Sequence, residues 1–179
     1  MHQSTNPLPH ASLPSTGQAF TALSVVNQIS AMIAYWDRDQ RCVFANNAYL
    51  LWFGKSPQQM VGMTLLELLG PLLYQKNLPY IKRALAGELQ VFERQIPMPG
   101  GGFRDTVATY TPDIFHGIIR GFSVHVADVT SLRQREAELA LAIREAITDL
   151  EKTKDSFRSK NLGQLRGRLE KVLVRLEDP

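Results

Sequence analysis

Segments with the two-residue periodicity of β-strands fall into two separate groups along this chain. The first group is residues 31–36 and 41–45, and the second is residues 89–98, 103–111 and 117–129. Helical patterns lie between and after the groups instead of following each strand. Because parallel strands need a crossover connection after each strand, this grouping predicts an α+β fold with an antiparallel sheet.

Capping and breaking residues mark the helices between the two groups. Ser56-Pro57 begins one short helix, and Thr64 begins another with Glu67 at the spacing of a capping box. Gly70-Pro71 breaks that helix and opens a longer one, in which Pro79 predicts a kink or a break. Either Asn46 or Asn47 can cap the helix that follows the first two strands.

The beginning of the chain has a different composition from the rest. Residues 1–16 are rich in Pro, Ser, Thr and His and carry no Lys, Arg, Asp or Glu, so we expect a disordered tail. Residues 17–30 predict a capping helix with one apolar face, made of Phe20, Leu23, Val26 and Ile29. Residues 31–130 then form the main domain.

The last predicted strand, GFSVHVADVT, runs directly into the helical pattern SLRQREAELA. Residues 131–160 predict a helix roughly 45 Å long, and residues 161–179 predict a second amphipathic helix. The apolar stripe of the first contains Leu132, Leu139, Ile143, Ala146, Leu150 and Phe157, with Glu136 and Thr153 as polar members. That of the second contains Leu162, Leu165, Leu169, Val172 and Leu176.

Composition excludes several classes of function. The net charge is only +3 and no basic run stands out, so nucleic acid is not an expected partner. Cys42 is the only cysteine, which leaves no disulfide and no cysteine-based metal site. The longest apolar run, residues 31–36, is far shorter than the ~20 residues that span a bilayer. We therefore expect a soluble, cytoplasmic protein without a membrane partner or a metal, and the absence of catalytic motifs predicts that it is not an enzyme.

Several stretches, taken in order, resemble the PAS family of sensor domains in its bacterial form. Tyr35-Trp36-Asp37 through Val43-Phe44-Ala45-Asn46-Asn47-Ala48 is similar to the opening hairpin and the following helix start of that family. Phe53-Gly54 and Met60-Val61-Gly62 are similar to short stretches of that family that end in glycine, and residues 117–130 are similar to its final strand. Asp128-Val129-Thr130 resembles the Asp-Ile-Thr motif at the end of many PAS domains. The resemblance implies a five-stranded antiparallel sheet with short helices on one face.

The resemblance also implies a function. In this family the Asp-Ile-Thr motif joins the sheet to a signalling helix, which makes Asp128 and Thr130 candidates for signal relay. A joint without a slack loop can pass a distortion of the sheet to the helix. The alternative is that both residues merely start a helix well. We expect a stand-alone sensory module that binds a small molecule or a partner and relays its state to a downstream signalling protein.

A PAS pocket lies between the sheet and the short helices, and by resemblance the Val126 face of the last strand looks into it, with His125 on the outer face. The candidate lining residues are Ile33, Tyr35, Phe44, Tyr49, Phe53, Leu69, Phe92, Arg94, Tyr110, Phe122 and Val126. Ordinary core packing is the alternative for each. If Arg94 points inward, an anionic small molecule is plausible, and if it points outward it is a surface charge. The cofactor is unknown; haem and flavin are not expected, because the family's haem histidine and reactive cysteine have no counterparts here.

The apolar stripes predict pairing of two chains, since a long helix with one apolar face needs a cover. The candidate interface residues are Phe20, Leu23, Val26, Ile29, Leu132, Leu139, Ile143 and Leu150. The helix could instead fold back on its own sheet. Two further readings are a ligand-free dimerisation or adaptor module and a transcription-linked regulator, which would use Arg166, Arg168, Lys171 and Arg175.

Overall fold

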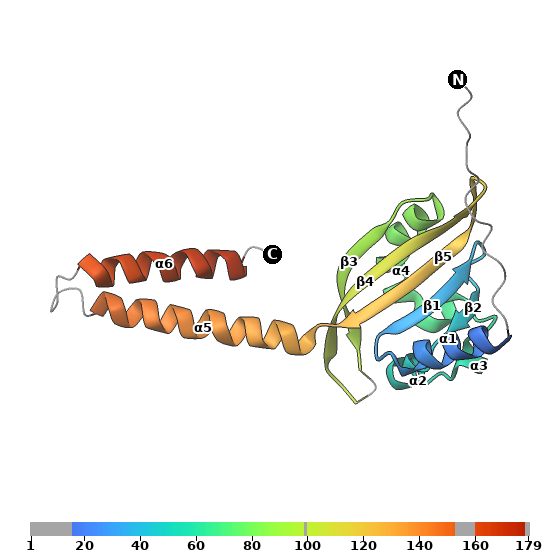
Figure 1. Cartoon of the computed structure of the whole chain (residues 1–179), viewed down its shortest axis with the longest axis horizontal. Coiled ribbons are helices and arrows are strands. Elements are labelled where there is room, and N and C mark those ends of the chain that lie inside the picture. The colour runs from blue at the N-terminus through green and yellow to red at the C-terminus, as the bar shows by residue number, and fades with distance from the viewer. Residues whose placement is uncertain (1–15, 99, 153–159, 178–179) are drawn as a thin grey trace, which may run out of the picture. The chain divides into compact units, whose positions relative to one another are not determined.

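The computed structural model describes residues 16–98, 100–152 and 160–177. Its sheet has five antiparallel strands in the order β2-β1-β5-β4-β3 (Figure 1). The strands are β1 (Met32–Asp37), β2 (Cys42–Ala45), β3 (Gln90–Pro97), β4 (Phe103–Phe115) and β5 (Ile118–Asp128). The α+β class and the antiparallel sheet predicted from the sequence are confirmed.

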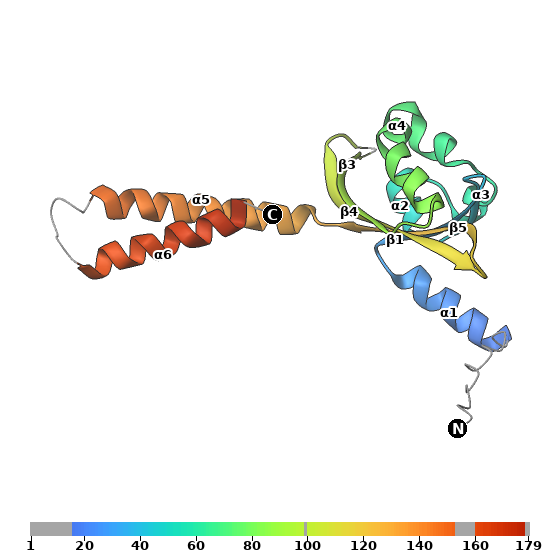
Figure 2. The same cartoon turned by 90° about the horizontal axis from the view of Figure 1, so that it is seen from above.

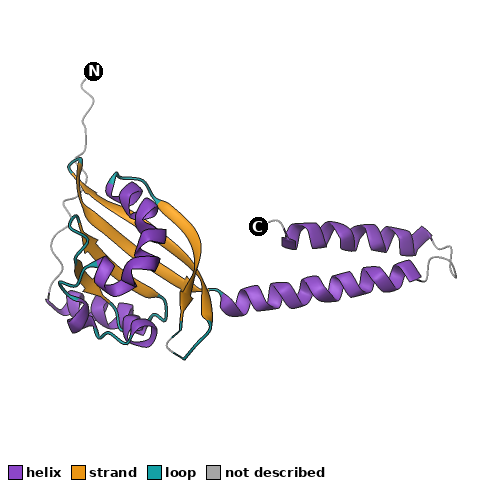
Figure 3. Ribbon diagram, turned by 180° about the vertical axis from the view of Figure 1, so that it is seen from behind, coloured by secondary structure: helices purple, strands orange, loops and turns teal. Residues whose placement is uncertain are grey.

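Helices lie on both sides of the sheet. Helix α1 (Thr16–Gln28) lies on one side, and α2 (Ala48–Phe53), α3 (Pro57–Met60) and α4 (Leu65–Leu85) lie on the other (Figure 2). Figure 3 shows the face of the sheet that this second group covers. No helix in the described ranges is long and apolar enough to cross a membrane.

The helix starts predicted at Ser56 and Thr64 form with side-chain caps, whereas the predicted asparagine cap of α2 does not. Ser56 and Gln59 make a reciprocal capping box at the start of α3, and Thr64 and Glu67 make another at the start of α4. Gly70, with φ of 70° and ψ of 166°, interrupts α4 where the break was predicted. Among the residues of α4 it alone leaves helical geometry, so the helix continues through Pro79.

The inner face of the sheet is set by the alternation along β1. Met32, Ala34 and Trp36 are buried, whereas the residues between them are half-buried. The antiparallel register places these three opposite Val126, Val124 and Phe122 of β5. Because alternate side chains share a face, these six residues form one apolar surface of the sheet.

The contacts divide the chain into two compact units, Met1–Phe92 with Ala108–Ala127, and Glu93–Val107 with Asp128–Pro179. The second contains the end of the β3–β4 hairpin and two long helices, α5 (Thr130–Lys152) and α6 (Lys160–Glu177). These helices lie side by side (Figures 1 and 2). The predicted tail up to residue 15, and the positions Thr153 and Phe157, lie outside the described residues.

Candidate functional site

A row of aromatic rings runs across the inner face of the sheet. Tyr80 of α4 stacks parallel to Phe92 of β3 with ring centres 3.7 Å apart. Phe92 meets Tyr110 of β4 edge-on at 5.1 Å, and Tyr110 meets Phe122 of β5 at 5.2 Å. Such pairs contribute roughly 0.5–1.5 kcal/mol each beyond the area they bury. The row therefore couples α4 to three strands through rigid side chains.

Two hydrogen-bond donors are buried in the same unit without an acceptor. The Nε1 of Trp36 on β1 and the Nδ2 of Asn77 on α4 have no hydrogen-bond partner among the described residues. Both side chains are almost completely inaccessible. An unsatisfied buried donor costs about 1–3 kcal/mol, so these two N–H groups are places where a group with an acceptor oxygen or nitrogen would be favoured. Neither residue stood out in the sequence as a pocket candidate.

Nine of the eleven predicted lining residues fall into three sets. Tyr49, Phe92, Tyr110, Phe122 and Val126 are buried, and Phe53 and Leu69 are half-buried in the helices that cover the inner face. Ile33 and Tyr35 lie on the outer face instead, because they alternate with Met32, Ala34 and Trp36. The expectation that Ile33 and Tyr35 line the inner pocket is therefore wrong.

Tyr35 belongs to a polar cluster on the outer face. Its hydroxyl donates to Oδ2 of Asp113 at 2.7 Å, and Arg120 donates to Oδ1 of the same carboxylate at 2.9 Å. Burial and the adjacent carboxylate raise the pKa of Tyr35 to about 12. The hydrogen bonds from Arg120 and Tyr35 lower the pKa of Asp113. This arrangement favours a charged Asp113 and a neutral Tyr35.

Phe44 also lies away from the predicted pocket. It lines an open groove of about 290 Å³ between α1, β2 and α3, together with Leu23, Asn27, Asn47 and Val61. Phe44 pairs with Tyr35 in the register of β1 and β2, so the correction to Tyr35 applies to Phe44 as well.

Asn46 links α1 to the sheet. Its Oδ1 accepts from the backbone N–H of Ile33 at 3.0 Å. Its Nδ2 lies within hydrogen-bond distance of the carbonyls of Val26, Ile29 and Ala31, at 3.1, 3.3 and 2.9 Å. Asn47 is the residue before α2, and its side chain makes no capping bond. The sequence identified these two asparagines only as possible caps.

The joint between the sheet and α5 is closed by hydrogen bonds. The Oγ1 of Thr130 accepts from the backbone N–H of Asp105 on β4 at 2.9 Å, and the N–H of Val129 donates to the carbonyl of Asp105 at 2.8 Å. Asp128 accepts from the N–H of Thr130 at 2.9 Å. Both candidate relay residues therefore hold the start of α5, and Thr130 ties it to the neighbouring strand.

Charged groups reinforce this joint. Arg133 in the first turn of α5 pairs with Glu93 of β3 and with Glu136 at 3.1 Å. The hydrogen bond to Glu93 is the main cause that raises the pKa of Arg133. Arg104 lies 3.7 Å from Asp128. Three strands thus contribute contacts to one helix start.

Arg94 lies beside this joint. It is half-buried and lines a shallow depression of about 180 Å³ with Glu93, Gln95, Asp105 and Thr106. The hydroxyl of Thr106 donates to the carbonyl of Arg94 at 2.7 Å. The carboxylates of Glu93 and Asp105 make this depression unfavourable for an anion. The anionic ligand therefore gains no support here and stays a prediction.

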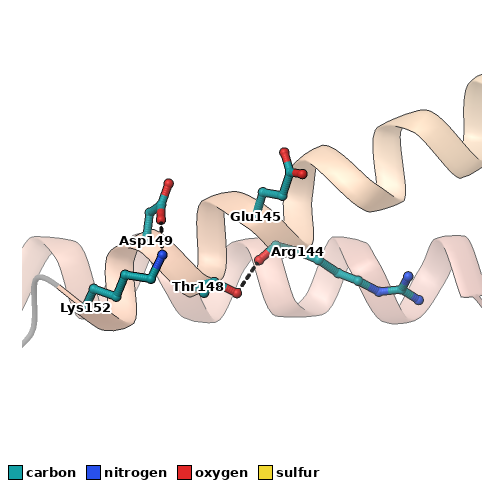
Figure 4. Close-up of a pocket in the computed structure, with 5 residues that line it drawn as sticks. All are labelled: Arg144, Glu145, Thr148, Asp149 and Lys152. Atoms are coloured by element: carbon teal, nitrogen blue, oxygen red, sulfur yellow. Dashed lines mark hydrogen bonds and ion pairs between the residues drawn. The ribbon is translucent and has the colours of Figure 1, made fainter.

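A larger open depression, of about 380 Å³, lies along α5 (Figure 4). All five residues that line it come from this helix, and they include the pair Lys152–Asp149 at 3.0 Å. Figure 4 shows Arg144 and Glu145 extending in different directions from the helix. Within the described ranges, no group of three or more His, Cys, Asp or Glu side chains could hold a metal ion.

Comparison with known proteins identifies the domain. The family model of the PAS fold matches residues 26–134. No curated protein matches. The PAS domain of BvgS from Bordetella pertussis is 20% identical, with a TM-score of 0.53 over 71% of this chain and 99% of that one.

Two similar structures belong to proteins that bind nucleic acid. An RNA-binding light-oxygen-voltage receptor is 19% identical, with a TM-score of 0.54 over 71% of this chain. A ligand and DNA complex of VqmA from Vibrio cholerae is 22% identical, with a TM-score of 0.55 over 62% of this chain. The chain spans only 37% and 51% of these two proteins. The expectation that excludes nucleic acid as a partner therefore finds no support.

Proposed function

Because this chain belongs to the PAS fold family, we propose that it is a sensory module that binds a small molecule or a partner and relays its state through α5 to another protein. PAS domains are in general sensory and regulatory rather than catalytic. The observation that carries the relay is the joint at Thr130. A strand of the sheet and the first turn of α5 share hydrogen bonds there, so a shift of β4 or β5 would move the helix start.

The buried donors of Trp36 and Asn77 support a small ligand with hydrogen-bond acceptors. The apolar surroundings favour a compact, mostly apolar molecule. We place the protein in the cytoplasm as part of this proposal. A homodimer is the expected assembly, to which α1 contributes the exposed side chains of Phe20 and Leu23 and the residue just after it, Ile29, contributes a third.

A transcription-linked regulator is the second candidate. Arg168, Lys171 and Arg175 are all exposed on α6 and lie three and four residues apart, on one side of the helix. VqmA and the light-oxygen-voltage receptor bind DNA and RNA, respectively. Binding of this chain to nucleic acid would weaken steeply with added salt.

Native mass spectrometry of the purified protein, with a denatured control, tests the sensory proposal. We expect a reproducible mass excess that denaturation removes. Hydrogen exchange then compares the protein as purified with protein stripped of this compound and refolded. We expect a change in protection at the amides of Val129 and Arg133, both of which are hydrogen-bonded at the joint.

Thr130→Val removes the hydroxyl that accepts from the backbone N–H of Asp105. In this variant, the hydrogen exchange of the α5 amides should no longer respond to the ligand. Ser131→Ala is the matched control, because Ser131 is the exposed neighbour of Thr130. If no mass excess is found, the proposal of small-molecule sensing is wrong, and a ligand-free dimerisation or adaptor module becomes the better explanation. A bound compound that leaves the exchange of α5 unchanged would rule out the relay.

A further inference from the structure

The hairpin of α5 and α6 buries one apolar seam and leaves a second one exposed. On α5, the least exposed apolar residues follow a three-four spacing at 140, 143, 147 and 150, and the half-buried Arg133 and Glu136, which pair with each other, continue this spacing toward the start of the helix. On α6 the least exposed apolar residues are 162, 169, 173 and 176, and Arg166 and Gly167 are also half-buried. This is the heptad spacing of helices that pack along a common seam. Ile143 and Leu150, predicted as interface residues between chains, belong to this inner seam.

The second seam lies one residue before the first on each helix. On α5 it contains Leu132, Leu139 and Ala146, and on α6 it contains Leu165 and Val172, all of them exposed. Their seven-residue spacing keeps each line on one side of its helix. In an antiparallel pair these two lines lie on the same flank of the hairpin. We call this set of five residues the apolar flank.

The opposite flank is closed by ion pairs. Arg144 pairs with Glu177, and Glu151 lies 3.9 Å from Arg166. These contacts also fix α6 antiparallel to α5. The opposite flank therefore carries ion pairs beside the separate exposed residues Leu141 and Val174, whereas the apolar flank has a continuous line of apolar residues on each helix.

The charges beside the apolar flank differ between the two helices. The outer side of α6 carries Arg168, Lys171 and Arg175 and no acid. The outer side of α5 carries Arg135, Glu138, Glu145, Asp149 and Lys152, so its three acids exceed its two bases by one, and Asp149 and Lys152 pair with each other. Two α6 helices would repel each other along this rim, whereas α5 and α6 would attract.

We propose that the apolar flank binds the same flank of a second copy of this chain, with α5 of each copy against α6 of the other in a four-helix bundle. A two-fold axis makes such an interface self-complementary, because each hairpin supplies one acidic and one basic helix. The bundle covers both apolar lines at once, as knobs-into-holes packing requires. This inference rests on the proposed function only in one respect, namely that the hairpin of α5 and α6 is the part of the chain that relays the signal.

Matched side chains on the two flanks allow a direct test. Leu139 and Val172 on the apolar flank are 51% and 42% exposed, and Leu141 and Val174 on the opposite side are 55% and 58% exposed. We compare Leu139→Glu/Val172→Glu with Leu141→Glu/Val174→Glu in the full chain by sedimentation equilibrium. The first pair should raise the dimer dissociation constant at least about tenfold, and the second pair should change it little. Circular dichroism shows that each variant is folded.

Charge exchange tests which helices meet. Arg168→Glu/Arg175→Glu should weaken the dimer, and adding Glu138→Arg/Glu145→Arg to the same chain should restore it. A monomeric wild-type chain, equal effects of the two Glu pairs, or no restoration would overturn the proposal. A salt-sensitive complex of the monomer with DNA or RNA, lost in Arg168→Glu/Arg175→Glu, would also overturn it and assign α6 to nucleic acid. None of these readouts depends on a bound ligand, so a ligand-free protein with the expected dimer would refute small-molecule sensing and leave the four-helix bundle standing.

Discussion

Replacement of Asn46 by Ala should destabilise the domain far more than the same change at the next residue. The side chain of Asn46 is fully buried, accepts from the N–H of Ile33 and donates toward the carbonyl of Val26 in α1 and that of Ala31, which follows this helix. Alanine would leave the half-buried N–H of Ile33 without the acceptor that it has in the structure, which costs about 1–3 kcal/mol. The lost donors to the carbonyls and the small cavity add roughly 1–2 kcal/mol.

We therefore expect Asn46→Ala to lower the free energy of unfolding by about 3 kcal/mol, or the melting temperature by roughly 10 °C. Asn47→Ala is the control, because Asn47 is exposed and only its backbone N–H, which alanine keeps, bonds to Asn27. It should cost less than about 0.5 kcal/mol. Urea denaturation followed by the fluorescence of the buried Trp36 and Trp52 measures both. Equal losses for the two variants, or a loss below about 1 kcal/mol for Asn46→Ala, would refute the assignment of Asn46 as the anchor of α1.

Two further predictions follow from perturbed pKa values. Burial and Asp113 raise the pKa of Tyr35 from 10.0 to about 12, so the fold favours the neutral phenol; this contribution to stability is complete below pH 10 and is lost as pH rises toward 12. Urea denaturation at a series of pH values measures this, and Tyr35→Phe should lose less free energy of unfolding over that pH interval than the wild type. An unchanged dependence of the free energy of unfolding on pH would contradict the cluster of Tyr35 with Asp113. Burial is the main cause that raises the pKa of the Cys42 thiol to about 11, so iodoacetamide should alkylate it much more slowly in the folded chain than in urea. Mass spectrometry measures this, and equal rates at mildly alkaline pH would show that Cys42 is accessible.

Local signals in the sequence predicted the elements of this fold well. Turns, capping boxes and the glycine break are decided by residues within a few positions of one another, as at Thr64, Glu67 and Gly70. The order of strands and helices then restricts the fold to an antiparallel sheet with covering helices.

The faces of β1 could not be predicted in the same way. Alternation separates Ile33 and Tyr35 from Ala34 and Trp36, but both sets are largely apolar, so no polar side marks the outer face. The inner face is decided by where α2, α3 and α4 pack, which depends on contacts between distant residues. Arg133 and Glu93 are forty positions apart in the sequence, so a local pattern could not predict their ion pair either.

The two seams of the hairpin show a related limit. Leu139 and Ile143 lie four residues apart and look like members of one stripe, yet only Ile143 faces α6. Two lines of apolar residues that are offset by one position overlap in sequence. The position of the second helix separates them.

The burial of Ala140 and Ile143 has a mechanical consequence. These two are the buried residues of α5, and they lie on the seam with α6, so α6 covers α5 from about Ala140 onward. The part of α5 before it, about 15 Å from Thr130 to Ala140, is a single helix, and the part beyond it is paired with α6. A pair of helices resists bending more than a single one, so bending of α5 should concentrate between Thr130 and Ala140. A rotation of the first turn of α5 would then pass through a short, flexible stretch of single helix before it reaches the stiffer pair of α5 and α6.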